Sequence, residues 1–242
     1  MLDKNDLKYS QDYTVTFSYI DNRGITRPSA IADFMQDAAT VHEMNLSIMK
    51  GEGFWVLSKL KYNLKRPLFP YETVTVATWC GDVKGAIWYR NFSFHVNDEL
   101  IGTGITAWVV LDRETHKIIR PTSIPNYESY LPNEKTAEKL GKIEKYNITS
   151  SEIHIVKYSD IDVNNHLNNV KAVDIIGNAI GLHNYEKEFI SEIQVNYLAE
   201  SYSDEELVIN ISKRDRNEMC IYAEYGGKSR FEAEMKLSRW KE

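Results

Sequence analysis

Two stretches of the sequence decide the fold: YTVTFSYID at residues 13–21 and HIVKYSDID at residues 154–162. They share hydrophobic spacing, both end on aspartate, and lie 141 residues apart. Further along, LSKL at residues 57–60 resembles ISEI at residues 190–193, now at an offset of 133. Because the register persists through several segments, the sequence indicates two copies of one domain.

A helix is predicted after the opening strand-like stretch of each copy. Pro28 stands near the start of the first helix, where a missing N–H is harmless. Apolar residues recur there at helical spacing: Ile31, Phe34, Met35, Ala38 and Ala39 in the first copy, and Val170, Val173, Ile176, Gly177 and Ile180 in the second. Both helices are apolar round much of their girth, which predicts burial against a sheet.

Four strands are expected after each helix: residues 54–64, 73–79, 86–96 and 104–111, then 189–197, 206–212, 218–225 and 230–240. Asn97-Asp98 and Gly226-Gly227 are hairpin turn signals. A strand, a helix and a run of antiparallel strands form a sheet wrapped round a helix, the hotdog arrangement. The predicted class is therefore α+β, a tandem (double) hotdog, with one domain over residues 1–120, a proline-containing linker over 121–147 and a second domain over 148–242.

The composition narrows the function classes. The chain has 242 residues, 43% of them hydrophobic, and a net charge of −6. The negative charge disfavours nucleic-acid and anionic-membrane partners. No apolar run approaches the roughly 18 residues of a membrane span, and the N-terminus lacks an apolar signal segment. We therefore expect a cytoplasmic protein with no membrane insertion.

Cysteine usage indicates neither a disulfide scaffold nor a zinc site. The two cysteines, Cys80 and Cys220, are expected as buried or half-buried thiols on strands. No cofactor or metal is expected. His42 and His183 match each other in the repeat, which predicts a shared structural place on the helix.

The two copies differ most just before the helix. The second copy has DVNNHLNN at residues 162–169, where the first has DNRGITR at residues 21–27. Asp162, Asn164 and His166 occupy alternate positions, and only the aspartate persists in the first copy. This difference indicates one catalytic copy and one that only builds the pocket.

Two interpretations of this polar segment remain open from the residues alone. A helix N-terminus with added amide and imidazole groups suits the polarisation of a carbonyl. The same residue types also cap helices and close turns. For Asp162, Asn164 and His166 the two interpretations are equally supported, whereas Asn168 and Asn169 are interpreted as structural.

The stretch SDIDVNNHLNNVK at residues 159–171 resembles the signature of plant and bacterial acyl-ACP thioesterases, a D-x-N-x-H-x-N-N pattern. FWVLS at residues 54–58 and TVTVATW at residues 73–79 resemble the N-terminal hotdog of that family. The similarity extends over nearly the whole chain. It implies hydrolysis of fatty acyl-ACP thioesters, with acyl binding in residues 1–120 and catalysis in residues 148–242.

The resemblance also implies a catalytic carboxylate. In NYLAES at residues 196–201, Glu200 takes the place of the family's glutamate, and Ser201 stands where the family often has cysteine. Ser201 lacks a nucleophile-elbow motif, so we expect attack by water. Glu200 would act as general base or polarise the water with His166, Asn164 would position the water or the carbonyl, and Asp162 would orient Asn164 or His166. This hypothesis requires Glu200 close to His166.

The resemblance implies an acyl carrier protein as partner, which needs a basic docking patch. Lys59, Lys61, Lys65 and Arg66 cluster near one strand end, with Lys84, Arg90, Arg113, Lys117 and Arg120 as further options. Ile31, Phe34, Met35, Trp55 and Leu57 either line an acyl tunnel or are plain core.

Three rival functions stay open: an acyl-CoA thioesterase of related fold, a double-hotdog hydratase acting on enoyl or 3-hydroxyacyl thioesters, and a non-catalytic acyl-binding protein. A homodimer is also open.

Overall fold

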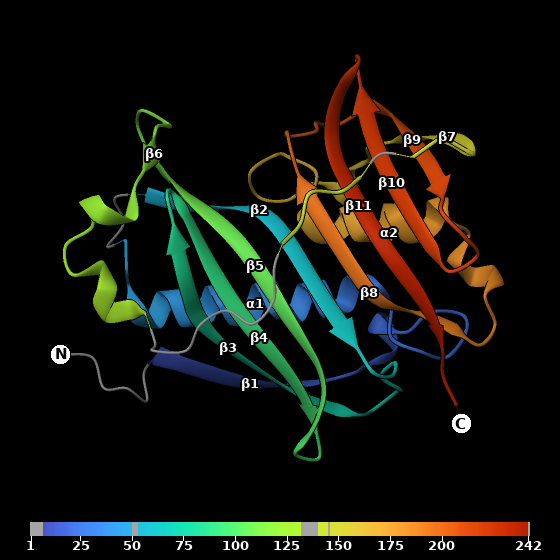
Figure 1. Cartoon of the computed structure of the whole chain (residues 1–242), viewed down its shortest axis with the longest axis horizontal. Helices are drawn as coiled ribbons and strands as arrows, with labels where there is room; N and C mark the ends of the chain where they lie inside the picture. Colours follow the sequence, from blue (N-terminus) through green and yellow to red (C-terminus); the bar gives the residue numbers. More distant parts are fainter. Residues whose placement is uncertain (1–6, 50–52, 132–139, 145, 242) are drawn as a thin grey trace. The chain divides into compact units, whose positions relative to one another are not determined.

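The computed structural model describes residues 7–49, 53–131, 140–144 and 146–241 (Figure 1). The chain divides into two compact units. The first unit comprises Met1–Thr14, Asp33–Tyr62 and Glu72–Leu140, and the second comprises Val15–Ala32, Asn63–Tyr71 and Gly141–Glu242. The second unit therefore takes two segments from the first copy of the sequence repeat.

The first unit is a sheet with one helix against it. Its strands follow the order β1 (Lys8–Thr14), β3 (Thr73–Lys84), β4 (Ile87–Val96), β5 (Glu99–Asp112) and β2 (Gly53–Leu64), with β6 (Ile118–Ile119) paired to β5. The pairs from β1 to β5 are antiparallel. Helix α1 (Pro28–Leu46) crosses behind these strands in Figure 1, and the residues from Asp33 onward belong to this unit.

Close packing joins α1 to this sheet. Phe34 and Met35 are almost fully buried. The Tyr13 ring stacks on Phe34 with centroids 4.7 Å apart, and the Tyr13 hydroxyl donates to Asp37 at 2.8 Å. A Cβ atom at Gly104 would lie 2.8 Å from the Met35 methyl carbon. Glycine at this position therefore lets the helix approach β5.

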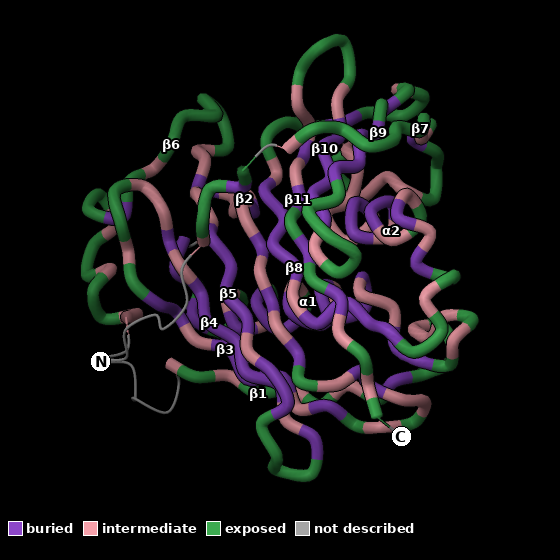
Figure 2. Tube along the Cα trace, turned by 45° about the vertical axis from the view of Figure 1, so that its right-hand side comes forward, coloured by how far each residue is buried: buried purple, intermediate pink, exposed green. Residues whose placement is uncertain are grey.

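The second unit repeats this architecture. Its antiparallel strands follow the order β8 (Glu188–Tyr197), β11 (Lys228–Arg239), β10 (Glu218–Tyr225), β9 (Glu206–Lys213) and β7 (Ser150–Ile155). Helix α2 (Asn169–Ala179) buries Ala172, Val173, Ile175 and Ile176. The Tyr197 hydroxyl on β8 donates to the Asn169 carbonyl at 3.0 Å. In Figure 2 the buried residues lie mainly in the strands and helices, while the loops are largely exposed.

Five short 3-10 helices complete the described structure: η2 (Phe17–Tyr19), η3 (Pro121–Ser123), η4 (Tyr127–Tyr130), η5 (Tyr158–Asp160) and η6 (Leu182–Asn184). No helix in the described ranges is long and apolar enough to cross a membrane.

The predicted α+β class and the tandem hotdog are confirmed, since each unit is an antiparallel sheet with one helix. Both predicted hairpin turns are present, with φ of 50° and 64° at Asn97 and Asp98, and 57° and 75° at Gly226 and Gly227. The opening strands differ from the prediction: they end at Thr14 and Ile155, because the chain then turns through η2 and η5.

Backbone hydrogen bonds confirm the register of the repeat. The N–H of Thr26 donates to the Leu68 carbonyl at 2.9 Å, and the N–H of Leu167 donates to the Ser201 carbonyl at 2.8 Å. These residues match at the two offsets, 141 and 133. Two further pairs match in the same way: Asp21 N to Ile25 O and Asp162 N to His166 O, both 2.9 Å, and Tyr71 N to Val15 O and Asp204 N to Val156 O, at 2.8 and 2.9 Å.

The end of the predicted linker packs on the second unit. The backbone of Gly141 exchanges hydrogen bonds with the Gln194 side chain at 3.1 and 2.9 Å. The Tyr222 hydroxyl donates to the Glu144 carbonyl at 2.8 Å, and Ile143 is buried. Within the predicted linker over 121–147, residues 132–139 and 145 lie outside the described residues.

Three single-residue predictions have clear outcomes. Cys80 on β3 and Cys220 on β10 are buried free thiols, as predicted. The shared helical place of His42 and His183 is wrong: His42 is buried in α1, whereas His183 lies in η6, because α2 ends before it. The prediction that Arg90 could belong to a surface docking patch is also wrong, because Arg90 is buried and its Nη1 lies 2.8 Å from His42 Nδ1.

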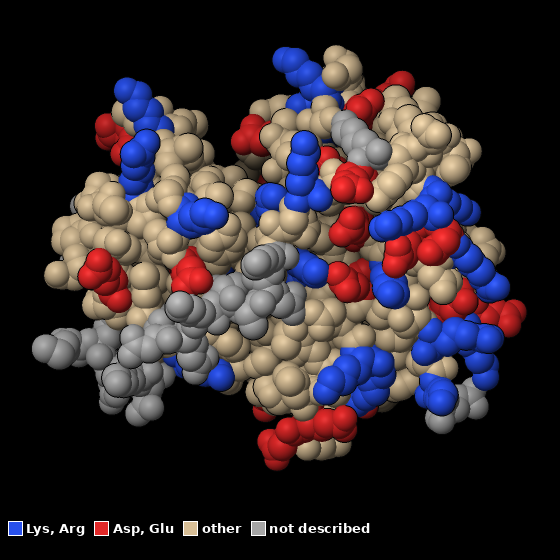
Figure 3. Space-filling view, in the orientation of Figure 1, with Lys and Arg blue, Asp and Glu red and all other residues tan. Residues whose placement is uncertain are grey.

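Charges of both signs cover the face of the second unit that Figure 3 shows. Glu218 on β10 lies 3.6 Å from Arg214 and 3.8 Å from Lys236. Opposite charges therefore lie close together at this end of β10.

Candidate active site

A tight turn carries the polar residues that precede α2. The Asp162 carboxylate accepts the backbone N–H of Asn164 at 2.8 Å, and the Asn164 side-chain amide lies 3.4 Å from the same carboxylate. Asn165 has a left-handed φ of 62°. Asp162 therefore contacts Asn164, one of the two residues that it was expected to orient.

His166 and Glu200 come together across two loops of the second unit. Nε2 of His166 lies 3.2 Å from Oε2 of Glu200. The His166 side chain is 29% exposed and that of Glu200 is 59% exposed, so water has access to the pair. The required proximity of these two residues is present.

Tyr202 is a third member of this cluster, which the sequence patterns did not predict. Its hydroxyl donates to Oε2 of Glu200 at 2.7 Å, and its ring meets the His166 ring edge-on with centroids 5.2 Å apart. The Glu200 carboxylate raises the pKa of Tyr202, first by accepting this hydrogen bond and then by its charge. The available signal was spacing, since residues two apart on an extended chain point to one side.

Arg230 on β11 holds the loop that carries Glu200. Its Nη1 donates to the Glu200 carbonyl at 2.7 Å, and its Nη2 donates to the Glu205 carboxylate at 3.0 Å. The side chains of Arg230 and Glu205 are only 14% and 12% exposed. A well-shielded, charge-assisted contact of this kind fixes the backbone at Glu200.

Ser201 lies beside Glu200 but is turned into the structure. It is 2% exposed, and its Oγ has no hydrogen-bond partner among the described residues. No hydrogen bond therefore joins this hydroxyl to His166, the contact that a serine nucleophile needs with its base.

Asn168 has the structural role that was predicted for it. Its side chain accepts the N–H of Val170 at 2.7 Å, which makes it the N-cap of α2. One of the free amides at this helix end is therefore occupied by the protein itself.

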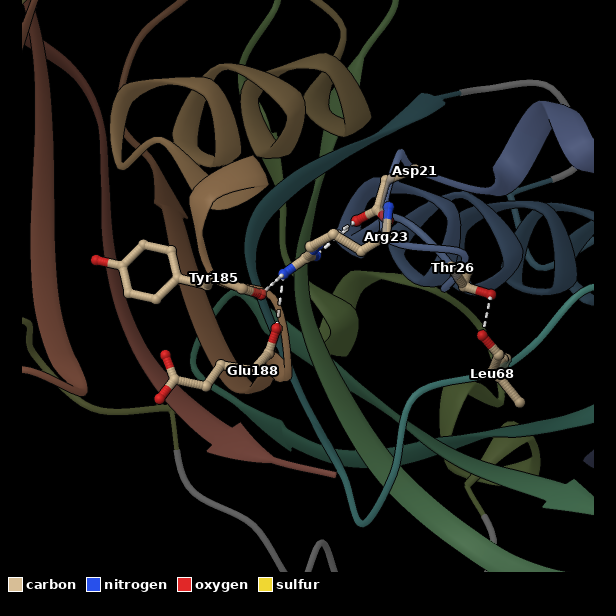
Figure 4. A network of polar contacts seen from close by, with 6 residues as sticks. All are labelled: Asp21, Arg23, Thr26, Leu68, Tyr185 and Glu188. Atoms are coloured by element: carbon tan, nitrogen blue, oxygen red, sulfur yellow. Dashed lines mark hydrogen bonds and ion pairs between the residues drawn. The ribbon is translucent and has the colours of Figure 1, made fainter. Parts of the chain in front are cut away.

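The equivalent turn of the first copy contains a structural ion pair. Asp21 accepts the backbone N–H of Arg23 at 2.8 Å, the same turn contact that Asp162 makes. Arg23 occupies the position of Asn164. Figure 4 shows its guanidinium between Asp21, at 2.5 Å, and the carbonyls of Tyr185 and Glu188, at 3.2 and 2.6 Å. The aspartate thus persists in both copies because it closes the turn.

The three polar side chains of this cluster, His166, Glu200 and Tyr202, have no polar counterparts in the first copy. At the two offsets of the repeat, His166, Glu200 and Tyr202 correspond to Ile25, Pro67 and Phe69. The surrounding backbone hydrogen bonds are nevertheless the same. In the first copy the Thr26 hydroxyl also donates to the Leu68 carbonyl at 3.0 Å (Figure 4). The fold therefore forms this loop pair without an imidazole, a carboxylate or a phenol.

Two models of protein-family domains together match most of the chain. The model of the acyl-ACP thioesterase N-terminal domain matches residues 6–124, and that of the C-terminal domain matches residues 143–236. The chain belongs to the acyl-ACP thioesterase family. It is therefore a thioester hydrolase, as the resemblance implied. No curated protein matches it in a direct sequence comparison.

Solved structures show that the whole chain has the fold of this family. An acyl-ACP thioesterase from Bacteroides thetaiotaomicron is 22% identical with a TM-score of 0.84, covering 98% of this chain and 100% of that chain. The 12:0-ACP thioesterase from Umbellularia californica is 18% identical with a TM-score of 0.85, covering 97% and 98%. A MaoC-like dehydratase from Phytophthora capsici is less similar, at 12% identity and a TM-score of 0.54 over 77% and 72%.

The first unit of this thioesterase contains a cavity of about 200 Å³. Four of its nine lining residues are aromatic, including Trp55, Trp88 and Trp108 from three strands, and the charged residues Glu43 and Arg90 also line it. Of the residues expected at an acyl tunnel, Trp55 lines this cavity, whereas the lining does not include Ile31, Phe34, Met35 or Leu57.

The described residues contain no cluster of three or more histidine, cysteine, aspartate or glutamate side chains arranged to hold a metal ion.

Proposed function

We propose that this chain hydrolyses fatty acyl-ACP to free fatty acid and holo-ACP, with Glu200 as general base. One observation carries the assignment of the site. His166 and Glu200 are in contact in one copy of the repeat, and both are replaced by apolar residues in the other, although the backbone frame is the same. Side chains that the fold does not need, gathered at one place, are best explained by chemistry.

Water attack follows from this arrangement. The water oxygen bonds to the thioester carbonyl carbon while Glu200 takes a proton from it. His166 contacts Oε2 of Glu200 through Nε2 at 3.2 Å, which leaves the other carboxylate oxygen to accept the proton. The tetrahedral intermediate then breaks its C–S bond, and Glu200 returns the proton to the leaving sulfur. The products are the fatty acid and the thiol of the carrier.

Asn164 and Asp162 complete the proposed site. The Asn164 amide donates to the thioester carbonyl as negative charge develops there. The Asp162 carboxylate holds Asn164 in place, as its contacts of 2.8 and 3.4 Å support. Ser201 takes no part, because its hydroxyl is buried without a hydrogen bond to His166.

The proposed substrate is an acyl chain on an acyl carrier protein. Membership of the family supports the carrier, and the tryptophan-lined cavity of the first unit supports an apolar chain. Residues 1–120 would hold the chain, residues 121–147 would link the domains, and residues 148–242 would perform the hydrolysis. All four proposed catalytic residues belong to the second unit.

The test is free-thiol release from acyl-ACPs of graded chain length, with the matching acyl-CoAs alongside. We expect faster release from acyl-ACP, and a rate at least about a hundredfold lower for Glu200→Gln. His183→Gln, a change in η6 outside the site, is the control and should retain the rate.

Each of the three alternative functions predicts a different result in these assays. Equal or faster turnover of acyl-CoA identifies an acyl-CoA thioesterase. Loss of enoyl absorbance without thiol release identifies a hydratase. Acyl-chain binding with no thiol release identifies a binding protein, and any of these results overturns the proposal.

A further inference from the structure

One oxygen of Glu200 has two polar neighbours. Oε2 receives the Tyr202 hydroxyl at 2.7 Å and lies 3.2 Å from Nε2 of His166. The Tyr202 ring also packs edge-on against the imidazole, at 84° and with centroids 5.2 Å apart. A single side chain therefore contacts both partners of the proposed general-base pair.

The repeat shows that the fold does not need the hydroxyl. Phe69 occupies the position of Tyr202 in the first copy, between Leu68 and Tyr71. Tyr71 and its counterpart Asp204 share a φ of 64°, so the backbone around the aromatic residue follows the same course. The two aromatic residues differ by one oxygen, and that oxygen is present only in the copy that has the carboxylate.

We propose that Tyr202 is a positioning residue for the hydrolytic reaction, whose hydroxyl fixes Oε2 of Glu200 so that Oε1 is presented to the attacking water. This inference rests on the proposed function. Glu200 lies in a loop with a largely exposed side chain, and an exposed carboxylate held by one neighbour rotates among several orientations. Two neighbours on one oxygen leave the second oxygen in a defined place.

The charges around Tyr202 agree with this role. Glu200 and Glu205 raise the pKa of the phenol and Arg230 lowers it, with the hydrogen bond to Glu200 as the largest influence. The His166 ring also contacts the ring of Tyr202. The phenol therefore keeps its proton at neutral pH and remains a donor to the carboxylate.

The experiment compares Tyr202→Phe with Tyr158→Phe in the full-length chain. Tyr158 is 93% exposed in η5 and serves as the matched control. For Tyr202→Phe we expect kcat to fall about tenfold, which corresponds to the loss of one hydrogen bond to a charged group. KM for acyl-ACP should stay within about twofold. The melting temperature should not change, since phenylalanine is accommodated at the equivalent place. An unchanged kcat, or a fall in melting temperature together with kcat, overturns the proposal.

A second measurement tests the contact without any turnover. The ultraviolet absorbance of ionised phenol, taken as the difference between the chain and its Tyr202→Phe variant, follows Tyr202 alone. In a Glu200→Gln background Tyr202 should ionise at lower pH than with Glu200 present. The glutamine is neutral and no longer disfavours the negative charge of the phenolate. Coinciding titrations overturn the inference. Absence of thiol release by the unmodified chain would instead overturn the proposed function and leave this measurement valid.

Discussion

His166 Nε2 lies 3.2 Å from Glu200 Oε2, although one residue precedes α2 and the other follows β8. The bond from the Leu167 N–H to the Ser201 carbonyl, at 2.8 Å, joins the residues directly after each of them. This backbone hydrogen bond joins the two loops next to the two side chains. The first copy keeps that bond and lacks the side chains, which makes it an internal control for experiments on the second.

Replacement of His166 by the residue of the first copy separates chemistry from folding. His166→Ile should fold normally, because Ile25 occupies the same frame, but should lower kcat/KM by about a hundredfold or more. Thiol release and a thermal melt measure the two effects. His183→Gln should change neither. A folded His166→Ile chain with normal turnover would remove the imidazole from the mechanism.

Ser201→Ala tests the alternative in which the serine attacks the thioester. The hydroxyl is buried and has no hydrogen-bond partner within the described part of the chain, so its loss should leave the free energy of unfolding unchanged or slightly higher. Turnover should remain within about twofold. A folded but inactive Ser201→Ala chain would show that water is not the nucleophile.

Arg23→Met tests the ion pair that replaces the polar site in the first copy. Its side chain is 4% exposed and joins Asp21 to two backbone carbonyls. Removal of the cation from a buried pair should lower the free energy of unfolding by about 3 kcal/mol or more, measured by urea denaturation.

Asn164→Ala is the matched variant at the equivalent position, where the residue is exposed. It should change the free energy of unfolding by only about 0.5 kcal/mol and yet reduce turnover. Equal destabilisation by both variants would contradict the division of roles between the copies.

Three tyrosines that are partly or fully buried predict how the stability changes at alkaline pH. Burial raises the pKa of Tyr197 and of Tyr222, and burial with the Asp37 contact raises that of Tyr13. The unfolded chain loses these protons near pH 10, while the folded chain keeps them. Their stabilising contribution is therefore complete below about pH 10 and is lost as pH rises beyond it, by up to about 1.4 kcal/mol per group per pH unit. Urea midpoints from about pH 8 to 11 measure the slope, and Tyr222→Phe should flatten it. A slope that does not respond to this substitution would count against burial as the cause.

The sequence by itself determined the duplication, the strand and helix order, the hairpin turns and the contrast between the two polar turns. These features are local. The hydrophobic period of a strand or helix and the glycine or asparagine residues of a turn can each be recognised within about a dozen consecutive residues. The offsets of 141 and 133 required only a comparison of one part of the sequence with another. The family signature at residues 159–171 was readable for the same reason.

Only the tertiary structure decided which side chains meet. Tyr202 contacts both Glu200 and His166. Arg90 is buried against His42, and His183 lies beyond the end of α2. It also assigned residues 15–32 and 63–71 to the second unit, across the copy boundary of the repeat. Such contacts depend on how distant segments close upon each other, and a hydrogen bond of 2.7 Å tolerates errors of only a few tenths of an ångström. Residue spacing along a chain does not carry that information, whereas the paired loops of the folded domain do.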